Sequence, residues 1–232
     1  GFRAQREIVQ QDWRPPVMRQ YDASEVARLF PDYVQDEQCL ILLVHEGPAS
    51  RVDAEILAVE SVMANLGLNA ADAAASEGWM SHRNNVPEWR DLLEQGLIAD
   101  TIEVSGTWSQ IDAIYEDVVA ALKTVPDCVN ASAHSSHVYR SGINLYFTFA
   151  CMPEDASVMG NRYLESWDQA LTATAKAGGG IAHHHGSGRL RRDYLHHDLG
   201  DNGLALLRKL KQVIDPQGIL NPGNLLPLTD VD

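Results

Sequence analysis

The chain has 232 residues, of which 45% are hydrophobic and 22% charged. That composition describes a folded globular protein of one large or two small domains, and it excludes a disordered chain, collagen and a coiled coil. The formal net charge of −14 argues against a nucleic-acid partner and favours a small molecule. No apolar stretch is long enough to span a membrane. The 3 cysteines lack a Cys-x-x-Cys pattern, so we expect buried free thiols in a reducing compartment.

The N-terminal half of the sequence predicts two strand-helix units. The first is a short strand over 17–21 followed by a helix that Asp22 caps. The second is an apolar strand over 39–44 followed by a helix. This helix begins at the capping-box-like Ser50-Arg-Val-Asp53 and ends at Gly67, with apolar residues at helical spacing between them.

The second half continues in the same way. Residues 101–105 alternate as in a half-buried strand, and Ser109 is expected to cap an amphipathic helix. Aromatic and β-branched residues over 142–150 predict another strand, and a long helix follows over about 155–176. These elements together predict an α+β fold, an antiparallel sheet with helices packed on one face.

The pattern changes after the glycine run at 178–180. Two short helices, over about 190–197 and 203–214, precede an irregular tail rich in proline and glycine. We therefore expect a first domain over 1–180, and a histidine loop with a C-terminal segment over 181–232.

The strongest candidate for chemistry is the triplet His183-His184-His185, which lies in the loop Gly178-Gly-Gly-Ile-Ala-His-His-His-Gly-Ser-Gly188. Neighbouring side chains point apart on a helix or a strand. Three consecutive histidines between glycines must therefore project from a turn or an extended loop, where two of them can converge on one site.

Three interpretations of the triplet compete. The histidines could be solvated and without a role, or they could form a metal site with His196 and His197. They could also belong to an active-site loop that binds an anion or moves a proton. Adjacent histidines are poor chelators of one ion, whereas the nearby arginines at 189, 191 and 192 suit an anion. We prefer the active-site loop and expect no metal.

Two further residues are ambiguous from pattern alone. Tyr146 lies on an apolar strand, where a core aromatic with a hydrogen-bonded hydroxyl is the default. Arg90 is an ordinary surface arginine near a helix start. Composition and spacing alone thus support an α+β domain with a histidine-rich loop and nothing sharper.

Two segments carry a family resemblance. The run from Gly178 through the triplet to Arg192, and the tail Val213-Ile-Asp-Pro-Gln-Gly-Ile-Leu-Asn-Pro-Gly-Asn-Leu-Leu226, closely resemble the C-terminal part of FAD-linked oxidases of the vanillyl-alcohol oxidase type. Within that family the chain is most similar to the alkyldihydroxyacetonephosphate synthases. The family carries an N-terminal FAD-binding domain that this sequence does not match. The resemblance therefore implies the cap or substrate domain of a larger flavoprotein, followed by its C-terminal helical return segment.

The resemblance also implies roles for single residues. Trp89-Arg-Asp-Leu92 is similar to the stretch whose arginine reaches flavin and substrate, and Tyr146-Phe-Thr-Phe149 is similar to the strand that carries a tyrosine acid or base. The expected catalytic residues are Tyr146, His184 and Arg90, the expected substrate-binding residues are His183, His185 and Arg189, and the expected cofactor-binding residue is Asn221.

A sibling branch, the flavin-dependent 2-hydroxyacid dehydrogenases, is less similar. Its loop reads Glu-His-Gly-Ile-Gly where this chain has His184-His-Gly-Ser-Gly188. It also carries a metal-binding Gly-Asp-Gly-Asn-x-His where this chain has Arg140-Ser-Gly-Ile-Asn-Leu-Tyr146. Both differences favour the synthase-like branch, and the second argues against a metal.

The resemblance implies a flavoenzyme domain that exchanges the acyl group of an acyl-dihydroxyacetonephosphate for a long-chain alkyl group in ether-lipid synthesis, without net redox change. An FAD-dependent oxidase or dehydrogenase of a hydroxylated small molecule is the first alternative. A chain that is inactive alone and serves as a binding or assembly module is the second.

The implied partners are a phosphorylated, lipid-like substrate and the absent FAD-binding domain, and a homodimer is kept as an alternative. Because that domain would hold most of the FAD, we expect this chain alone to bind FAD weakly or not at all. The tail has no peroxisomal Ser-Lys-Leu, so we expect a cytoplasmic location.

Overall fold

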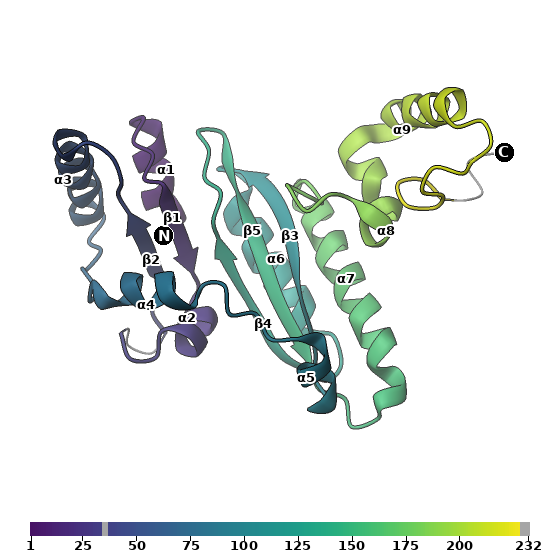
Figure 1. Cartoon of the computed structure of the whole chain (residues 1–232), viewed down its shortest axis with the longest axis horizontal. Helices are drawn as coiled ribbons and strands as arrows, with labels where there is room; N and C mark the ends of the chain where they lie inside the picture. Colours follow the sequence, from purple (N-terminus) through teal and green to yellow (C-terminus); the bar gives the residue numbers. More distant parts are fainter. Residues whose placement is uncertain (34–36, 228–232) are drawn as a thin grey trace.

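The computed structural model describes residues 1–33 and 37–227. At its centre is a five-stranded antiparallel sheet with the strand order β2-β1-β4-β5-β3 (Figure 1). The strands are β1 Val17–Tyr21, β2 Leu40–Val44, β3 Ile98–Thr107, β4 Cys128–Ser135 and β5 Gly142–Cys151. The predicted α+β class with an antiparallel sheet is confirmed.

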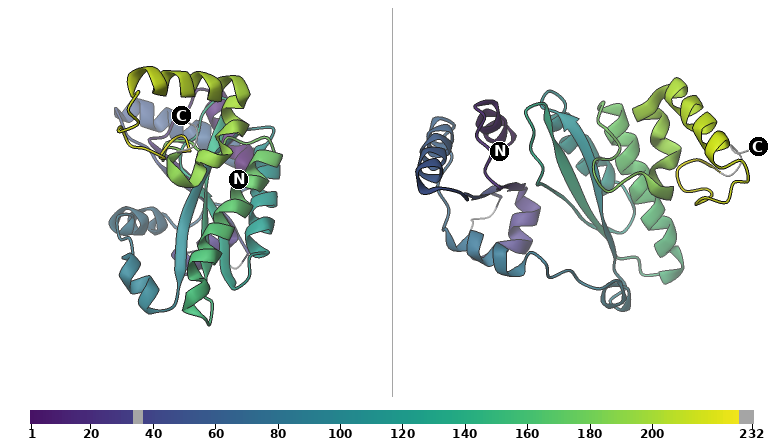
Figure 2. Two further views of the ribbon diagram at one scale, coloured as in Figure 1. Left: turned by 90° about the vertical axis from the view of Figure 1, so that its right-hand side faces the viewer. Right: turned by 45° about the horizontal axis from the view of Figure 1, so that its top comes forward.

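Nine α-helices are assigned within the described ranges. They are α1 Phe2–Gln10, α2 Ala23–Leu29, α3 Ala49–Asn65, α4 Ala74–His82, α5 Trp89–Glu94, α6 Ile111–Lys123, α7 Met159–Lys176, α8 Gly188–Arg191 and α9 Leu195–Ile214. Figures 1 and 2 place α8 and α9 beyond the sheet, at the opposite end of the molecule from α1 and α3. None of the helices traced in these ranges is both long and apolar enough to cross a bilayer.

The main core lies between the sheet and helices α6 and α7. Successive side chains of a strand point to opposite faces. On β5, the buried Leu145 and Phe147 join the core cluster with Ile114 and Val118 of α6 and Leu171 of α7. Every second residue of the strand therefore faces away from these helices, and this open face is polar.

The strand register aligns four polar or aromatic residues across the open face. Glu103 of β3 pairs with Tyr146 of β5, which pairs with His134 of β4, which pairs with Tyr21 of β1. Directly opposed residues of an antiparallel sheet lie on the same face. The sheet thus builds one continuous row, Tyr21-His134-Tyr146-Glu103, on the face that α6 and α7 leave open.

Most of the predicted elements are present, with differences in detail. Asp22 caps α2 as predicted, because its carboxylate accepts a hydrogen bond from the backbone N–H of Glu25. The predicted caps at Ser50 and Ser109 are wrong, since the N-cap positions of α3 and α6 are Pro48 and Gln110. The prediction that all cysteines are buried is also wrong, because Cys39 is exposed just before β2.

Candidate active site

Glu103 is the residue around which the candidate site is built. It lies between Ile102 and Val104, which are both buried in the core below the sheet. The alternation of β3 therefore directs Glu103 to the open face. The side chain is 0% exposed, so a separate segment must cover it and satisfy its oxygens.

The glycine run after α7 brings that covering segment into place. Gly178 adopts φ of +78°, which a residue with a side chain would adopt only with strain. Gly180 then forms an antiparallel bridge with Ser105, with hydrogen bonds of 2.8 and 3.0 Å in the two directions. The chain is thereby attached to the free edge of β3, and residues 181–187 turn over the open face.

The histidine triplet folds around the Glu103 carboxylate. The backbone N–H groups of His184 and His185 donate to Oε2 at 3.0 and 3.2 Å. On the other oxygen, Oε1, Asn144 Nδ2 donates at 2.7 Å, and Nδ1 of His183 and of His184 lie at 3.1 and 2.6 Å. Glu103 therefore fixes both the path of the loop and the orientation of two imidazole rings.

The far nitrogens of these two rings reach phenol hydroxyls. His184 Nε2 lies 3.1 Å from the Tyr146 hydroxyl, and His183 Nε2 lies 2.9 Å from the Tyr139 hydroxyl. With the closer Nδ1–H, that of His184, directed at Glu103, His184 Nε2 is an acceptor for the Tyr146 O–H. The contact between the two Nδ1 atoms leaves His183 with its proton on Nε2, which donates to the Tyr139 oxygen. The site thus contains two Glu-His-Tyr chains that share one carboxylate.

A buried arginine holds the loop against the sheet. Arg191 is 6% exposed and donates to the carbonyl oxygens of Ile181, Gly186 and Glu103 at 3.0, 3.2 and 3.1 Å. Its guanidinium also lies 4.7 Å from the ring centroid of Trp167 on α7. Among the described residues no carboxylate lies within salt-bridge distance of Arg191, so these contacts are what satisfy the buried cation. They also connect both ends of the histidine loop to β3.

Electrostatics set the protonation of the site. Burial acts to raise the pKa of Glu103, but the hydrogen bonds from Asn144 and from the backbone of His184 and His185 outweigh it and lower the pKa to about 2. Burial raises the pKa of the Tyr146 phenol and lowers the pKa of His185. At neutral pH the carboxylate is therefore ionised, the Tyr146 phenol protonated and His185 neutral.

The structure brings some of the predicted residues together and leaves others apart. Tyr146 and the whole triplet, His183 to His185, converge on Glu103. Arg90 is exposed on α5, which precedes the Ile98 end of β3 (Figure 1). Arg189 and Asn221 are exposed on α8 and in the tail, and among the described residues neither forms a hydrogen bond or ion pair with the Glu103 cluster.

Sequence reasoning missed three groups of this cluster, which are Glu103, His137 and Tyr139. It named Arg191 as suited to an anion, but the guanidinium donates to carbonyl oxygens of the chain. A polar residue between two apolar ones on a strand is expected to face solvent. The sequence therefore did not indicate that Glu103 is buried beneath the histidine loop.

Four potential ligand atoms lie close together in this cluster. Glu103, His137, His183 and His184 each contribute one such atom, all within 4.8 Å of one another. Both Glu103 oxygens, however, already accept hydrogen bonds from backbone or amide donors. The geometry is that of a hydrogen-bonded acid-base network, and the absence of a metal stays a prediction.

Comparison with known proteins gives the family. The model of the family described as FAD linked oxidases, C-terminal domain, matches residues 1–225. The chain belongs to this family. The uncharacterized FAD-linked oxidoreductase YgcU of Escherichia coli K12 is 32% identical over 245 residues, which cover 98% of this chain and 49% of that protein. The alkyldihydroxyacetonephosphate synthase of Dictyostelium discoideum is 27% identical, over 82% of this chain and 32% of that protein.

A solved structure agrees with these sequence relatives. An alkyldihydroxyacetonephosphate synthase matches with a TM-score of 0.66 at 23% identity, over 94% of this chain and 41% of that chain. This likeness supports the fold. The chain spans about half the length, or less, of the relatives that it matches.

The family implies FAD in the full-length enzyme, and the residues present fit part of that cofactor. The side chains of His184 and His185 are 45% and 39% exposed, and their imidazoles can hydrogen-bond the polar edge of an isoalloxazine ring.

Proposed function

We propose that this FAD-linked oxidase C-terminal domain forms the substrate side of a flavoenzyme site in which Tyr146 transfers a proton at the reacting carbon. The observation that carries the proposal is the chain Glu103 Oε1, His184, Tyr146 Oη, with contacts of 2.6 and 3.1 Å. Carboxylate, imidazole and hydroxyl in this order form the arrangement by which a neutral hydroxyl is turned into a base.

The residues of this chain divide the work as follows. Glu103 stays ionised and stabilises the His184 tautomer that carries its proton on Nδ1. His184 Nε2 then accepts the Tyr146 proton while the Tyr146 oxygen takes a proton from the substrate carbon. The reverse transfers return a proton to the product. A bound flavin would supply the electron-accepting ring that such a carbon requires.

We further propose that the reaction is the exchange of the acyl group of an acyl-dihydroxyacetonephosphate for an alkyl group. The supporting observations are the histidine triplet around Glu103 and the similarity to the Dictyostelium synthase over 82% of this chain. Exposed cations and imidazoles suit a phosphate, and Arg189 and His185 are our candidates for that contact. Arg90 and Asn221 are proposed to contact the flavin that the FAD-binding domain holds.

An FAD-binding domain is proposed to pack on the C-terminal segment, residues 181–232, of which 228–232 lie outside the described residues. Large apolar side chains on α9 and the tail are exposed there, among them Leu206, Val213, Ile214 and Ile219. Apolar surface of this kind favours a covering partner. We expect the FAD phosphates to be held by that domain, so titration of the chain alone should give weak FAD binding or none.

A second candidate function is an FAD-dependent oxidation of a hydroxylated small molecule. It is favoured by the 32% identity to an FAD-linked oxidoreductase, which extends over 98% of this chain. The same Tyr146, His184 and Glu103 would then deprotonate the substrate while two electrons pass to the flavin and then to an acceptor.

Product analysis on the flavoenzyme that contains this chain separates the two reactions. Acyl-dihydroxyacetonephosphate and a long-chain alcohol are supplied, and ether product and oxygen uptake are measured. Ether product without oxygen uptake supports the exchange reaction. Flavin reduction by hydroxylated substrates, with no ether product, contradicts it and supports the oxidase. A protein that binds ligand but does neither supports the binding-module alternative.

A further inference from the structure

The second Glu-His-Tyr chain of the site is not used by the proposed chemistry. Tyr139 lies in the connection between β4 and β5, and its hydroxyl is 2.9 Å from His183 Nε2. His183 Nδ1 lies 3.1 Å from the same Glu103 oxygen that His184 approaches. A single carboxylate therefore orients two imidazoles that lead to two different phenols.

The two imidazoles are also in contact with each other. Nδ1 of His183 and Nδ1 of His184 are 3.0 Å apart, which is hydrogen-bond distance. Hydrogen-bonding atoms therefore run without interruption from the Tyr146 hydroxyl, across His184 and His183, to the Tyr139 hydroxyl, with steps of 3.1, 3.0 and 2.9 Å.

We propose that His184, His183 and Tyr139 form a proton wire that connects Tyr146 to solvent. The proposal rests on the proposed function, since it takes Tyr146 as the group that exchanges a proton with substrate. Tyr146 is partly buried, and a substrate and flavin seated over it would exclude water from that side. A proton taken from the substrate would then need another way out.

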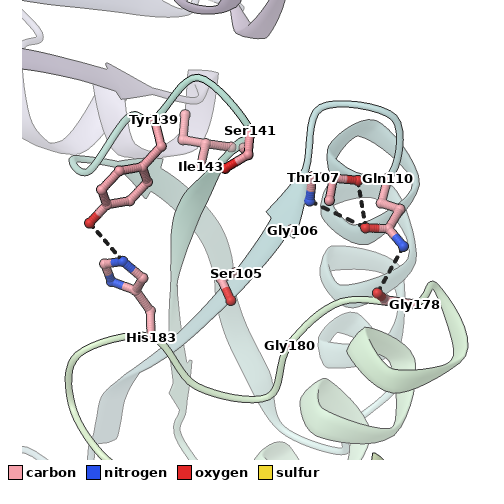
Figure 3. A pocket seen from close by; sticks show the side chains of 11 residues that line it. Ser105, Gly106, Thr107, Gln110, Tyr139, Ser141, Ile143, Gly178, Gly180 and His183 are labelled. Carbon is pink, nitrogen blue, oxygen red and sulfur yellow. Dashed lines mark hydrogen bonds between the residues drawn. The ribbon is translucent and has the colours of Figure 1, made fainter. Parts of the chain in front are cut away.

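A cavity at the far end of the wire supplies that way out. Tyr139 and His183 line a space of about 290 Å³ at the Thr107 and Gly142 ends of β3 and β5 (Figure 3). The other lining residues contribute hydroxyl, amide, glycine and isoleucine groups: Ser105, Gly106, Thr107, Gln110, Ser141, Gly142, Ile143, Gly178 and Gly180. Tyr139 is 47% exposed, and a polar space of this size holds several waters.

The transfer balances at each step. His183 carries its resting proton on Nε2, where it is directed at the Tyr139 oxygen, so its Nδ1 has a free lone pair. His184, protonated on both nitrogens after it has taken the Tyr146 proton, gives its Nδ1 proton to this Nδ1 of His183. The Nε2–H bond of His183 breaks as its proton passes to the Tyr139 oxygen, and the Tyr139 O–H proton leaves to solvent in the cavity. Each N–H or O–H bond that breaks is matched by one that forms, and no electrons are gained or lost.

The neighbours of the wire suit this transfer. His137 lies beside both rings, with ring centroids 5.3 Å from His183 and 4.5 Å from His184. Burial lowers the pKa of His137, so this ring is neutral at neutral pH and adds no repelling charge. Glu103 is ionised and 0% exposed, and it stabilises the positive charge while that charge resides on either histidine.

The decisive variant is Tyr139→Phe in the flavoenzyme that contains this chain. Tyr163→Phe is the matched control, because its hydroxyl bonds to Asp100 instead of the cluster. In a single turnover the first step should stay within about twofold of wild type, since Tyr146 and His184 are intact. Steady-state turnover should fall by about tenfold or more. Loss of a positioned proton-transfer group usually slows an enzyme by about 100-fold or more.

Added imidazole should restore the lost turnover in a concentration-dependent way, because the cavity admits a small base next to His183. Unchanged steady-state turnover in Tyr139→Phe would overturn the wire, and so would a loss that imidazole does not restore. Failure of the wire can be distinguished from failure of the proposed function. The proposed function fails if Tyr146→Phe still carries out the first step at a normal rate, and this result does not depend on the behaviour of Tyr139→Phe.

A second measurement does not need the flavin. Nitrogen NMR of histidine-labelled chain reports which ring nitrogen carries the proton. Tyr139→Phe should alter this distribution at His183 and, through the contact between the Nδ1 atoms, at His184, whereas Tyr163→Phe should alter neither. A His184 signal that does not respond to Tyr139→Phe would also overturn the wire.

Discussion

Two buried carboxylates on the open face of the sheet have the same acidity and different surroundings. Glu103 and Glu25 are 0% and 1% exposed, and the pKa of each is lowered to about 2. For both, burial acts to raise the pKa and nearby donors or charges outweigh it. Acidity alone therefore does not tell which of the two belongs to a reaction site.

The partners of the two carboxylates separate them. Glu25 on α2 accepts from Ser132 Oγ at 3.0 Å and from Arg28 Nη2 at 2.9 Å, and His134 Nδ1 is 3.9 Å away, too far for a hydrogen bond. These contacts join α2 to β4, and none of them involves a tyrosine hydroxyl. Glu103 is bonded to a loop whose imidazoles continue to two phenols.

The two regions meet at Tyr146. One face of its ring stacks on His134, with centroids 4.8 Å apart and planes 10° apart, while its hydroxyl reaches His184. The Glu25 side thus supports the ring of Tyr146, and the Glu103 side reaches its reacting atom. The comparison predicts that changes near Glu103 alter turnover and that changes near Glu25 alter stability.

Tyr146→Phe should have the largest effect. The ring and its stacking on His134 remain, and only the hydroxyl that reaches His184 is lost. Turnover of the flavoenzyme should fall by about 100-fold or more, with an unchanged melting temperature. Tyr163→Phe serves as the control. A loss within about tenfold would mean that Tyr146 is a core aromatic and that the two regions do not differ as argued.

Glu103→Gln should come next. A glutamine amide cannot accept all the donors that converge on the carboxylate, and its NH₂ would face a backbone or an imidazole N–H. We expect turnover to fall by about tenfold or more, together with a loss of stability of about 1–3 kcal/mol. Steady-state kinetics and urea unfolding check both parts. Normal turnover in a destabilised protein would reduce Glu103 to a structural residue.

Glu25→Gln should lower stability by a similar amount, about 1–3 kcal/mol, and keep turnover within about threefold of wild type. The folded-state pKa of Glu25 is about 2, below the ordinary 4.5, so its charge stabilises the fold at pH above about 4.5. That contribution is lost as pH falls from about 4.5 towards about 2. The difference in unfolding free energy between wild type and Glu25→Gln should therefore shrink over this interval. A constant difference would contradict the assigned acidity.

Arg191→Lys should have a smaller effect on turnover. Lysine keeps the charge but lacks the planar fork that reaches the carbonyls of Ile181, Gly186 and Glu103. We expect a lower melting temperature and a several-fold loss of turnover, because the histidine loop is held less firmly. Arg189→Lys, on an exposed side chain two residues away, should leave the melting temperature unchanged. Equal melting temperatures for the two variants would argue against a role of Arg191 in holding the loop.

Patterns of strong amphipathicity made much of the fold predictable. The residues that became β3, β5 and α7 alternate or recur with the period of their structure. β4 could not be given residue bounds from the sequence, because Cys128-Val-Asn-Ala-Ser-Ala-His-Ser135 is mostly small or polar and has little strand preference. Its place between β1 and β5 is set by tertiary pairing.

The candidate site was predictable only in part for a related reason. The triplet has an unusual sequence, and the family resemblance singled out Tyr146. Glu103 and Arg191 matter because they are buried. They are buried because a loop more than seventy positions later in the chain returns to β3, where Gly180 pairs with Ser105. No local pattern reports such a contact.

Removal of metal should have the smallest effect of all. Glu103, His137, His183 and His184 are close enough to suggest a divalent ion, yet both Glu103 oxygens accept hydrogen bonds from Asn144 or backbone donors. An ion there would displace these bonds and hold His184 Nδ1, which would prevent the histidine from passing a proton. Dialysis against a chelator should thus leave the melting temperature and turnover unchanged, and elemental analysis should find well below one equivalent. Zinc could instead raise the melting temperature of the wild type and of Glu25→Gln but not that of Glu103→Gln. This result would show that the Glu103 cluster binds metal, and it would contradict the role in proton transfer that distinguishes Glu103 from Glu25.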